Sequence, residues 1–200
     1  DNCTANPVVA FVNESSDSNS CPEVITRYYS VTDSCGNSIT VSQTITVNDT
    51  IPPTITCPAD VYVQCESDIP APDTAAVTAS DNCGSVSIQW VNDVPDNNNC
   101  PLRVVRTYRA VDDCGNETTC AQNIIVNDTI PPTASNPAGI TVACASQVPA
   151  PDINVVTDEA DNCTANPIVA FVNESSNNSS CPEVITRYYS VTDSCGNSIT

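Results

Sequence analysis

The chain has 200 residues and a formal net charge of −19, with five arginines and no lysine, histidine or methionine. This acidity excludes binding to nucleic acid, because that affinity comes from basic side chains that displace the counterions of phosphates. No apolar run is long enough for a membrane-spanning helix. Thr, Val, Ser, Asn, Asp and Pro dominate, which is typical of short strands joined by polar turns.

The thirteen cysteines indicate an oxidising compartment outside the cytoplasm. Zinc binding is the alternative explanation, but the sequence contains no Cys-x-x-Cys motif and no histidine to complete a tetrahedral site. We therefore expect disulfides and an extracellular protein.

The sequence repeats with a period of about 80 residues, which marks a tandem array. The tripeptide DNC begins at Asp1, Asp81 and Asp161. The octapeptide VNDTIPPT occupies 47–54 and again 126–133, and its two prolines predict a stiff, extended connector. The repeat therefore divides the chain into three modules: the C-terminal part of one repeat at 1–50, a complete repeat at 51–130, and a third at 131–200 that lacks its last strand.

Within a repeat, the pattern of apolar residues predicts five or six short strands. In chain order they cover 8–13, 23–33, 38–49, 59–65 and, more weakly, 75–79. Val9 and Phe11 are expected to point inward, as are Ile88 and Trp90 in the complete repeat. The turn DSCGN predicts a hairpin. The fold class is all-β: a tandem array of small, disulfide-stapled, immunoglobulin-like β-sandwiches.

Strand geometry suggests how four recurring cysteines pair inside one repeat. Cys100 and Cys114 lie at opposite ends of one strand, too far apart for a disulfide. Cys83 and Cys100 begin antiparallel strands and are also at opposite ends. This leaves Cys83 with Cys114 and Cys65 with Cys100.

The same logic gives the remaining bonds. Cys57 and Cys120 are expected to join the first and last strands, which run parallel in immunoglobulin-like sandwiches. The equivalent pairs in the other repeats are Cys3 with Cys35, Cys144 with Cys181, and Cys163 with Cys195. One cysteine, Cys21, is left over and is expected to pair outside these 200 residues.

Catalysis is not expected. A nucleophile and base normally require His, Lys or a free Cys, and here the first two are absent and the cysteines are assigned to disulfides. Asp112 and Asp113 form the closest candidate carboxylate pair, but a hairpin tip on a small sandwich offers no cleft.

Calcium is the one cofactor that the sequence suggests. Aspartates recur at the hairpin tip and at the connector, and hard oxygen ligands on loops are what Ca²⁺ takes. The candidate ligands are Asp33, Asp49, Asp112, Asp128 and Asp193. The DNC aspartates are expected at the tip end of each repeat, and Asp49 and Asp128 at the far end. Turn formation by Asp and Asn is the preferred explanation, because no EF-hand spacing is present.

One arginine recurs in phase with the apolar face of its strand, at Arg27, Arg106 and Arg187. An inward arginine needs a carboxylate or carbonyl partner. A side chain that reaches solvent at the edge of the sandwich is the preferred interpretation.

The segments DNC, CPEVITRYYSVTDSCGNSITVSQTITVNDTIPPT and the 80-residue period resemble the HYR-like repeats of very large cell-surface adhesins in Bacteroidota, a class that includes gliding-motility adhesins. The resemblance spans the whole chain. It implies export by the type IX secretion system and display as filaments attached to the outer membrane. It also implies O-glycosylation at Asp-Thr motifs, here Thr50, Thr74 and Thr129.

The expected function is therefore structural: the stalk or shaft of an adhesin filament that serves surface attachment and gliding. The expected partners are neighbouring modules, the outer-membrane motility or secretion machinery, and external surfaces or glycans. The alternative is that the modules themselves bind carbohydrate or protein through the variable loop at 15–20, 95–99 and 175–180.

Overall fold

A computed structural model describes residues 6–200, and it shows an all-β chain. The expectations that involve Asp1 and Cys3 lie outside the described residues. The helical segments are four short 3-10 turns: η1 (Glu66–Asp68), η2 (Thr74–Ala76), η3 (Ala145–Gln147) and η4 (Ile153–Val155). Within residues 6–200, no helix is long and apolar enough to cross a membrane. Four disulfides place the chain outside the cytoplasm.

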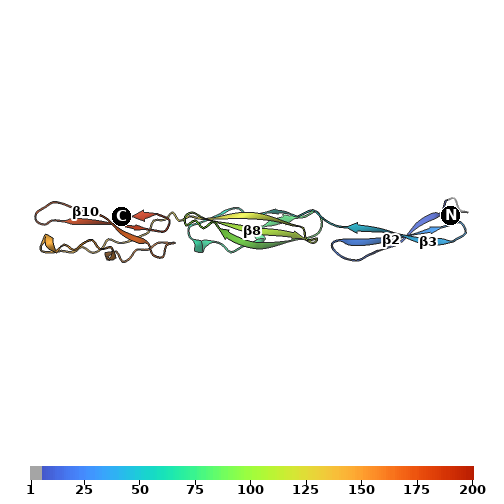
Figure 1. Cartoon of the computed structure of the whole chain (residues 1–200), viewed down its shortest axis with the longest axis horizontal. Coiled ribbons are helices and arrows are strands. Elements are labelled where there is room, and N and C mark those ends of the chain that lie inside the picture. Colours follow the sequence, from blue (N-terminus) through green and yellow to red (C-terminus); the bar gives the residue numbers. More distant parts are fainter. Residues whose placement is uncertain (1–5) are drawn as a thin grey trace. The chain divides into compact units, whose positions relative to one another are not determined.

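The first repeat forms one antiparallel sheet in the order β1-β2-β3, of which β2 and β3 are labelled in Figure 1. The strands are β1 (Val8–Ser16), β2 (Glu23–Thr32) and β3 (Ser38–Val47). The predicted hairpin joins β2 to β3, and the Asp33 amide donates to the Asn37 carbonyl at 2.9 Å. Gly36 has φ +86°, a conformation that glycine adopts without steric cost.

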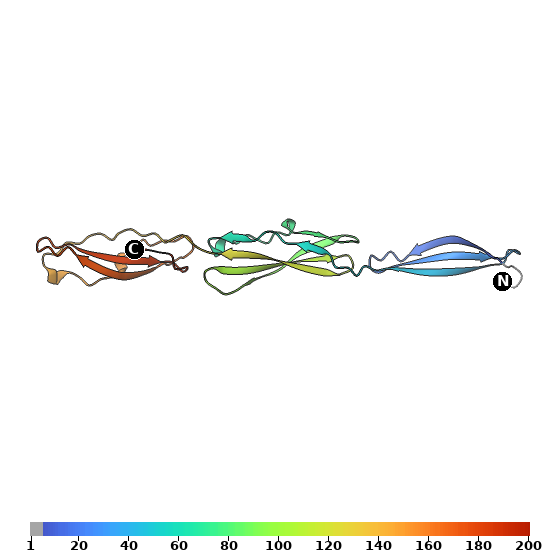
Figure 2. The same ribbon diagram turned by 90° about the horizontal axis from the view of Figure 1, so that it is seen from above.

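The expectation that Val9 and Phe11 point into a core is wrong. Their exposed fractions are 63% and 57%. The sheet of this repeat is a single layer (Figure 2), because the equivalents of the strands that precede 81 in the complete repeat are not among the 200 residues. Phe11 instead makes an edge-to-face contact with Tyr29 across the strand pair.

The complete repeat contains two sheets. A two-stranded sheet pairs β4 (Thr54–Thr56) with β6 (Thr78–Ser80), and the predicted strand at 75–79 is divided between η2 and β6. The larger sheet has the order β5 (Val61–Val63), β9 (Glu117–Val126), β8 (Leu102–Asp112) and β7 (Val86–Pro95). β5, which corresponds to the strand predicted at 59–65, runs parallel to β9 as expected, but β4 precedes it in the repeat.

The core of this repeat follows the period-two alternation of β8 and β9. Every second residue of β8 is buried, from Val104 to Asp112, and Tyr108 and Ile124 are almost fully enclosed. The prediction for Ile88 and Trp90 is only partly correct, because Ile88 is half-buried whereas Trp90 is 46% exposed.

The third repeat has one regular sheet, formed by β10 (Ile168–Ser176), β11 (Ile185–Thr192) and β12 (Ser198–Ile199). Its N-terminal half is irregular, and only an isolated bridge joins Thr133 to Ala160. The segment 138–144, which is the counterpart of β5, forms no strand. β5 pairs with residues 124–126 of β9, whose counterparts are not among the 200 residues.

By backbone contacts the chain divides into two compact units whose limits cut across the sequence repeats. Unit 1 comprises 1–58, 73–91 and 107–121, and unit 2 comprises 59–72, 92–106 and 122–200. The junction of the first and second repeats thus lies inside unit 1, and the next junction inside unit 2. The module boundaries drawn from the sequence stay predictions.

The recurring arginine always bonds a carboxylate thirteen positions earlier, on the neighbouring strand. Arg27 pairs with Glu14 at 2.9 Å and Arg187 with Glu174 at 3.0 Å. Arg106 is 2% exposed and makes two parallel hydrogen bonds to Asp93, at 2.9 and 2.7 Å. The preferred interpretation of a solvent-reaching side chain is therefore wrong for Arg106.

Replacing Asp93 by Ala should destabilise the protein by about 3 to 5 kcal/mol, because it leaves the Arg106 guanidinium buried and without its carboxylate. The matched control is Glu14→Ala, which removes the equivalent ion pair where both side chains are about half exposed. It should destabilise the protein much less, because water already screens this pair. Urea unfolding of both variants measures the difference, and equal losses would contradict the role given to burial.

Lowering the pH should destabilise the conformation of the loop at 95–99, which precedes β8. It should not affect the counterpart of this loop at 175–180 in the third repeat. The Arg103 and Asn98 backbone amides donate to the Asp96 carboxylate and lower its pKa below the ordinary 3.8. Because the folded-state pKa lies below the unfolded value, this stabilisation is complete above about pH 4 and is lost as the pH falls through the folded-state pKa. Asn177 makes the same contacts with an amide oxygen that does not titrate in this range.

An NMR pH titration measures this directly. The Arg103 amide signal should move below about pH 4, while the equivalent Val184 amide stays constant. Asp96→Asn should abolish the Arg103 transition, and a transition that persists in this variant would contradict the assignment.

Candidate functional site

The disulfides are the first feature of the junctions between repeats. The structure contains Cys21–Cys114, Cys57–Cys120, Cys65–Cys163 and Cys100–Cys195. Among these four disulfides of the described residues, only Cys57–Cys120 lies within a repeat. The other three join residues 93 to 98 positions apart and link each repeat to the next.

These bonds confirm one predicted pair and correct the others. Cys57–Cys120 is present as expected. The predicted pairs Cys65–Cys100, Cys83–Cys114 and Cys163–Cys195 are wrong, and Cys21 pairs with Cys114 rather than outside the 200 residues. The pair Cys144–Cys181 is also wrong, and Cys3–Cys35 falls partly outside the described residues. Among residues 6–200 the unpaired cysteines are Cys35, Cys83, Cys144 and Cys181.

The physical reason for the correction is how consecutive repeats meet. Cys100 and Cys114 do flank the single strand β8, as predicted, and lie too far apart to pair with each other. However, the connector brings the end of one repeat against the hairpin tip of the next. Cys100 therefore forms a disulfide with Cys195 across the junction, and not with a cysteine of its own repeat.

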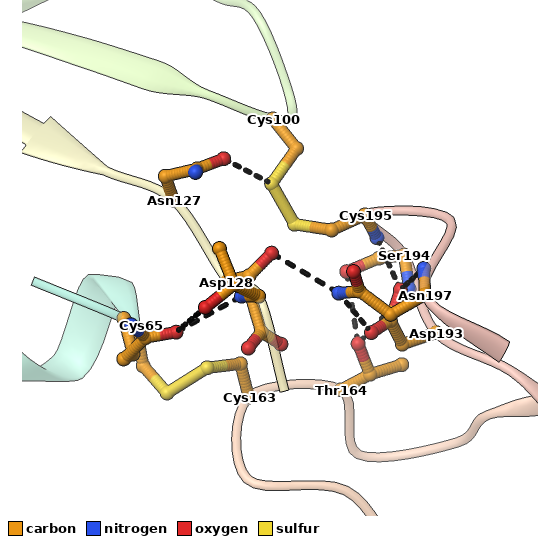
Figure 3. Close-up of a disulfide and its surroundings, with 12 residues drawn as sticks. Cys65, Cys100, Asn127, Asp128, Cys163, Thr164, Asp193, Ser194, Cys195 and Asn197 are labelled. Atoms are coloured by element: carbon orange, nitrogen blue, oxygen red, sulfur yellow. Dashed lines mark hydrogen bonds between the residues drawn. A yellow bond between two sulfur atoms is a disulfide. The ribbon is translucent and has the colours of Figure 1, made fainter. Parts of the chain in front are cut away.

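A cluster of three aspartates lies at the second junction. Two of them, Asp128 and Asp193, are labelled in Figure 3 beside the disulfides Cys65–Cys163 and Cys100–Cys195. Asp128 follows β9 at the connector, Asp161 begins the DNC segment, and Asp193 follows β11 at the hairpin. Carboxylate oxygens from all three lie within 4.8 Å of one another. We call this set the Asp128 cluster; all of it lies in unit 2.

Hydrogen bonds from the backbone hold each of these carboxylates in place. The Cys195 and Asn197 amides donate to Asp193 Oδ1, both at 2.8 Å. The Asn197 side-chain amide donates to Asp193 Oδ2 at 2.7 Å and to the Asp128 backbone carbonyl at 3.0 Å. Asn197 of the third repeat thus forms a hydrogen bond to the connector of the second.

The first junction repeats this arrangement inside unit 1, with Asp49, Asp81 and Asp112 as the Asp49 cluster. Asn116 takes the place of Asn197, donating to Asp112 Oδ2 at 2.9 Å and to the Asp49 carbonyl at 3.1 Å. The two junctions therefore share one chemical design.

Several oxygens of both clusters are buried and have no hydrogen-bond partner: Asp49 Oδ2, Asp81 Oδ1, Asp128 Oδ2 and Asp161 Oδ1. The opposite oxygens accept backbone amides, and the Ile51 amide lowers the pKa of Asp49. Burial by itself would raise the pKa of Asp161, but the Thr164 and Cys163 amides hold it below its ordinary value. Each cluster thus presents carboxylate oxygens turned towards one another.

The structure brings together four of the five predicted calcium ligands, in two groups. Asp49 meets Asp112 and Asp128 meets Asp193, whereas Asp33 belongs to no cluster among the described residues. The sequence placed tip and connector aspartates at opposite ends of one repeat, and so missed that they meet across a junction. Asp81 and Asp161 complete the clusters; their recurrence in DNC was the available signal.

The predicted glycosylation residues Thr50, Thr74 and Thr129 are all exposed. Their modification stays a prediction.

Comparison of the chain with protein-family models and with curated proteins found no match.

Removing a disulfide between repeats should lower stability. The double variant Cys65→Ser, Cys163→Ser opens a closed loop of about 98 residues and should cost about 2 to 4 kcal/mol. Cys83→Ser, which removes an unpaired thiol, is the control and should leave the denaturation midpoint unchanged. A control that destabilises as much as the double variant would show that Cys83 is paired in solution.

Proposed function

We propose that the chain is part of the shaft of an extracellular adhesin filament, built from tandem immunoglobulin-like sandwich modules that transmit tension. The observation that carries this proposal is the set of disulfides that join consecutive repeats. A chain of modules joined only by a connector lengthens when any module unfolds. Covalent bonds between modules prevent that lengthening.

The shortest covalent route through the chain sets the length to which the chain can be extended. From Cys21 it crosses to Cys114, follows β8 back to Cys100, and crosses to Cys195. Only 14 positions separate Cys100 from Cys114, against 174 between Cys21 and Cys195 along the main chain. At about 3.5 Å per residue, the intact route spans roughly 50 Å plus two cross-links, and the main chain roughly 600 Å.

The same pattern frames one strand in every repeat. Cysteines flank β2 at Cys21 and Cys35, and β11 at Cys181 and Cys195. In an array that continues with the same period, Cys35 and Cys181 would bond the neighbouring repeats. Tension would then pass along one strand per repeat.

The resemblance to HYR-like repeats, including those of the gliding-motility adhesin SprB, supports a place on the bacterial surface. In this proposal the type IX secretion system exports the chain, and the motility machinery of the outer membrane moves the filament. The exposed threonines at Thr50, Thr74 and Thr129 would carry the glycans. Ligand binding by the variable loops is less well supported, because the Asp96 carboxylate is engaged by amides of its own loop.

Force spectroscopy with handles at both ends of the chain tests the proposal. In the oxidised protein, kept in EDTA, the segment between Cys21 and Cys195 should extend to no more than about 60 Å. After reduction it should extend to roughly 600 Å. An oxidised protein that extends to several hundred ångströms would overturn the proposal. Disulfides within repeats alone would leave about 74 positions free between Cys21 and Cys195, or roughly 260 Å.

Two double variants serve as matched controls. Cys57→Ala with Cys120→Ala removes a disulfide that is not on the shortest route, and the limit of about 60 Å should persist. Cys100→Ala with Cys195→Ala diverts the route through the other three bonds and about 46 positions, and the limit should rise to roughly 175 Å.

A further inference from the structure

Neither aspartate cluster contains a positive charge. The chain has no lysine or histidine, and its five arginines bond elsewhere. Their partners are Glu14 for Arg27, Asn123 for Arg103, Asp93 for Arg106, Glu117 for Arg109 and Glu174 for Arg187. Three carboxylates within 4.8 Å therefore face one another with no protein cation available to neutralise them.

The buried position of Asp128 adds an independent observation. Asp128 is 4% exposed, and its Oδ2 atom is buried without a hydrogen-bond donor. Its Oδ1 atom accepts from the Ile130 amide at 3.1 Å and from the Asn162 side chain at 3.2 Å. A buried carboxylate oxygen without a partner is unfavourable, and a positively charged ligand at this position would satisfy it.

From these contacts we infer that each cluster binds one Ca²⁺ ion, coordinated by Asp49, Asp81 and Asp112 at the first junction and by Asp128, Asp161 and Asp193 at the second. All the donors are carboxylate oxygens, which are hard ligands. The nearby cysteine sulfurs of the second cluster are held in disulfides, so no thiolate favours zinc.

Each site draws its ligands from two consecutive repeats. Asp128 belongs to the connector that ends the second repeat, and Asp161 and Asp193 belong to the third. An ion would therefore fasten the connector to the hairpin tip at the position where Asn197 already bonds the Asp128 carbonyl. Unlike a turn-forming role for these residues, this assignment predicts two ions per chain.

The clearest test follows the side-chain amide signals of Asn116 and Asn197 by NMR while Ca²⁺ is added to the EDTA-treated, oxidised chain. Both signals should shift and saturate, with dissociation constants of about 10⁻⁴ to 10⁻³ M, as in other extracellular modules. Calorimetry should give two ions per chain.

Asparagine variants assign the two sites separately, because asparagine keeps an oxygen for the backbone amides but removes the charge. Asp161→Asn should abolish the Asn197 response and leave that of Asn116, and Asp81→Asn should do the reverse. Asp33→Asn is the control, since Asp33 accepts the same turn bonds from Cys35 and Asn37 but lies in no cluster of the described residues. It should leave both responses intact.

Three outcomes would overturn the assignment: no saturable shift up to 10 mM Ca²⁺ (about ten times the weakest expected constant), two ions still bound by the Asp81→Asn, Asp161→Asn double variant, or equal shifts with Mg²⁺. Mass spectrometry of each variant confirms that its disulfides are intact, so that misfolding is not mistaken for lost binding. The result is separable from the shaft proposal, because the force measurement is made in EDTA and depends on the disulfides alone.

Discussion

The disulfides between consecutive repeats are the constraint that determines how the whole chain responds to unfolding. A small repeat with few aromatic residues encloses only a thin core, here centred on Tyr108 and Ile124. Such a core gives a single repeat little resistance to unfolding. Bonds such as Cys100–Cys195 limit the consequence of unfolding. A repeat that is bonded to both neighbours by disulfides can lose its packing without a large increase in the length of the chain.

The same junctions concentrate charge. Each brings together aspartates from the connector of one repeat and from two loops of the next, and Asn116 or Asn197 bridges the two sides. The surface of the chain is acidic throughout, so the repeats repel one another at long range. Disulfides oppose this repulsion permanently, whereas a bound cation would oppose it in proportion to its concentration.

The sequence was sufficient for features that depend on one repeat. Alternation of apolar residues located the long strands, the DSCGN turn located the hairpin, and the parallel first and last strands identified Cys57–Cys120. It failed where two repeats meet, because strand-end arguments show at which end a cysteine lies but not what faces it there. Pairing within repeats left only Cys21 over, whereas the observed pairing leaves four described cysteines unpaired, so the cysteine count favoured the wrong pattern. The burial of Arg106 does not follow from its own strand, because its carboxylate partner, Asp93, lies on the neighbouring strand.

Peptide mapping of the secreted, non-reduced protein by mass spectrometry tests the central claim most directly. We expect cross-linked peptides that join Cys21 to Cys114, Cys65 to Cys163 and Cys100 to Cys195. Peptides that join Cys65 to Cys100 and Cys83 to Cys114 would show that each repeat is closed on itself, and would contradict both the covalent route for tension and the function drawn from it.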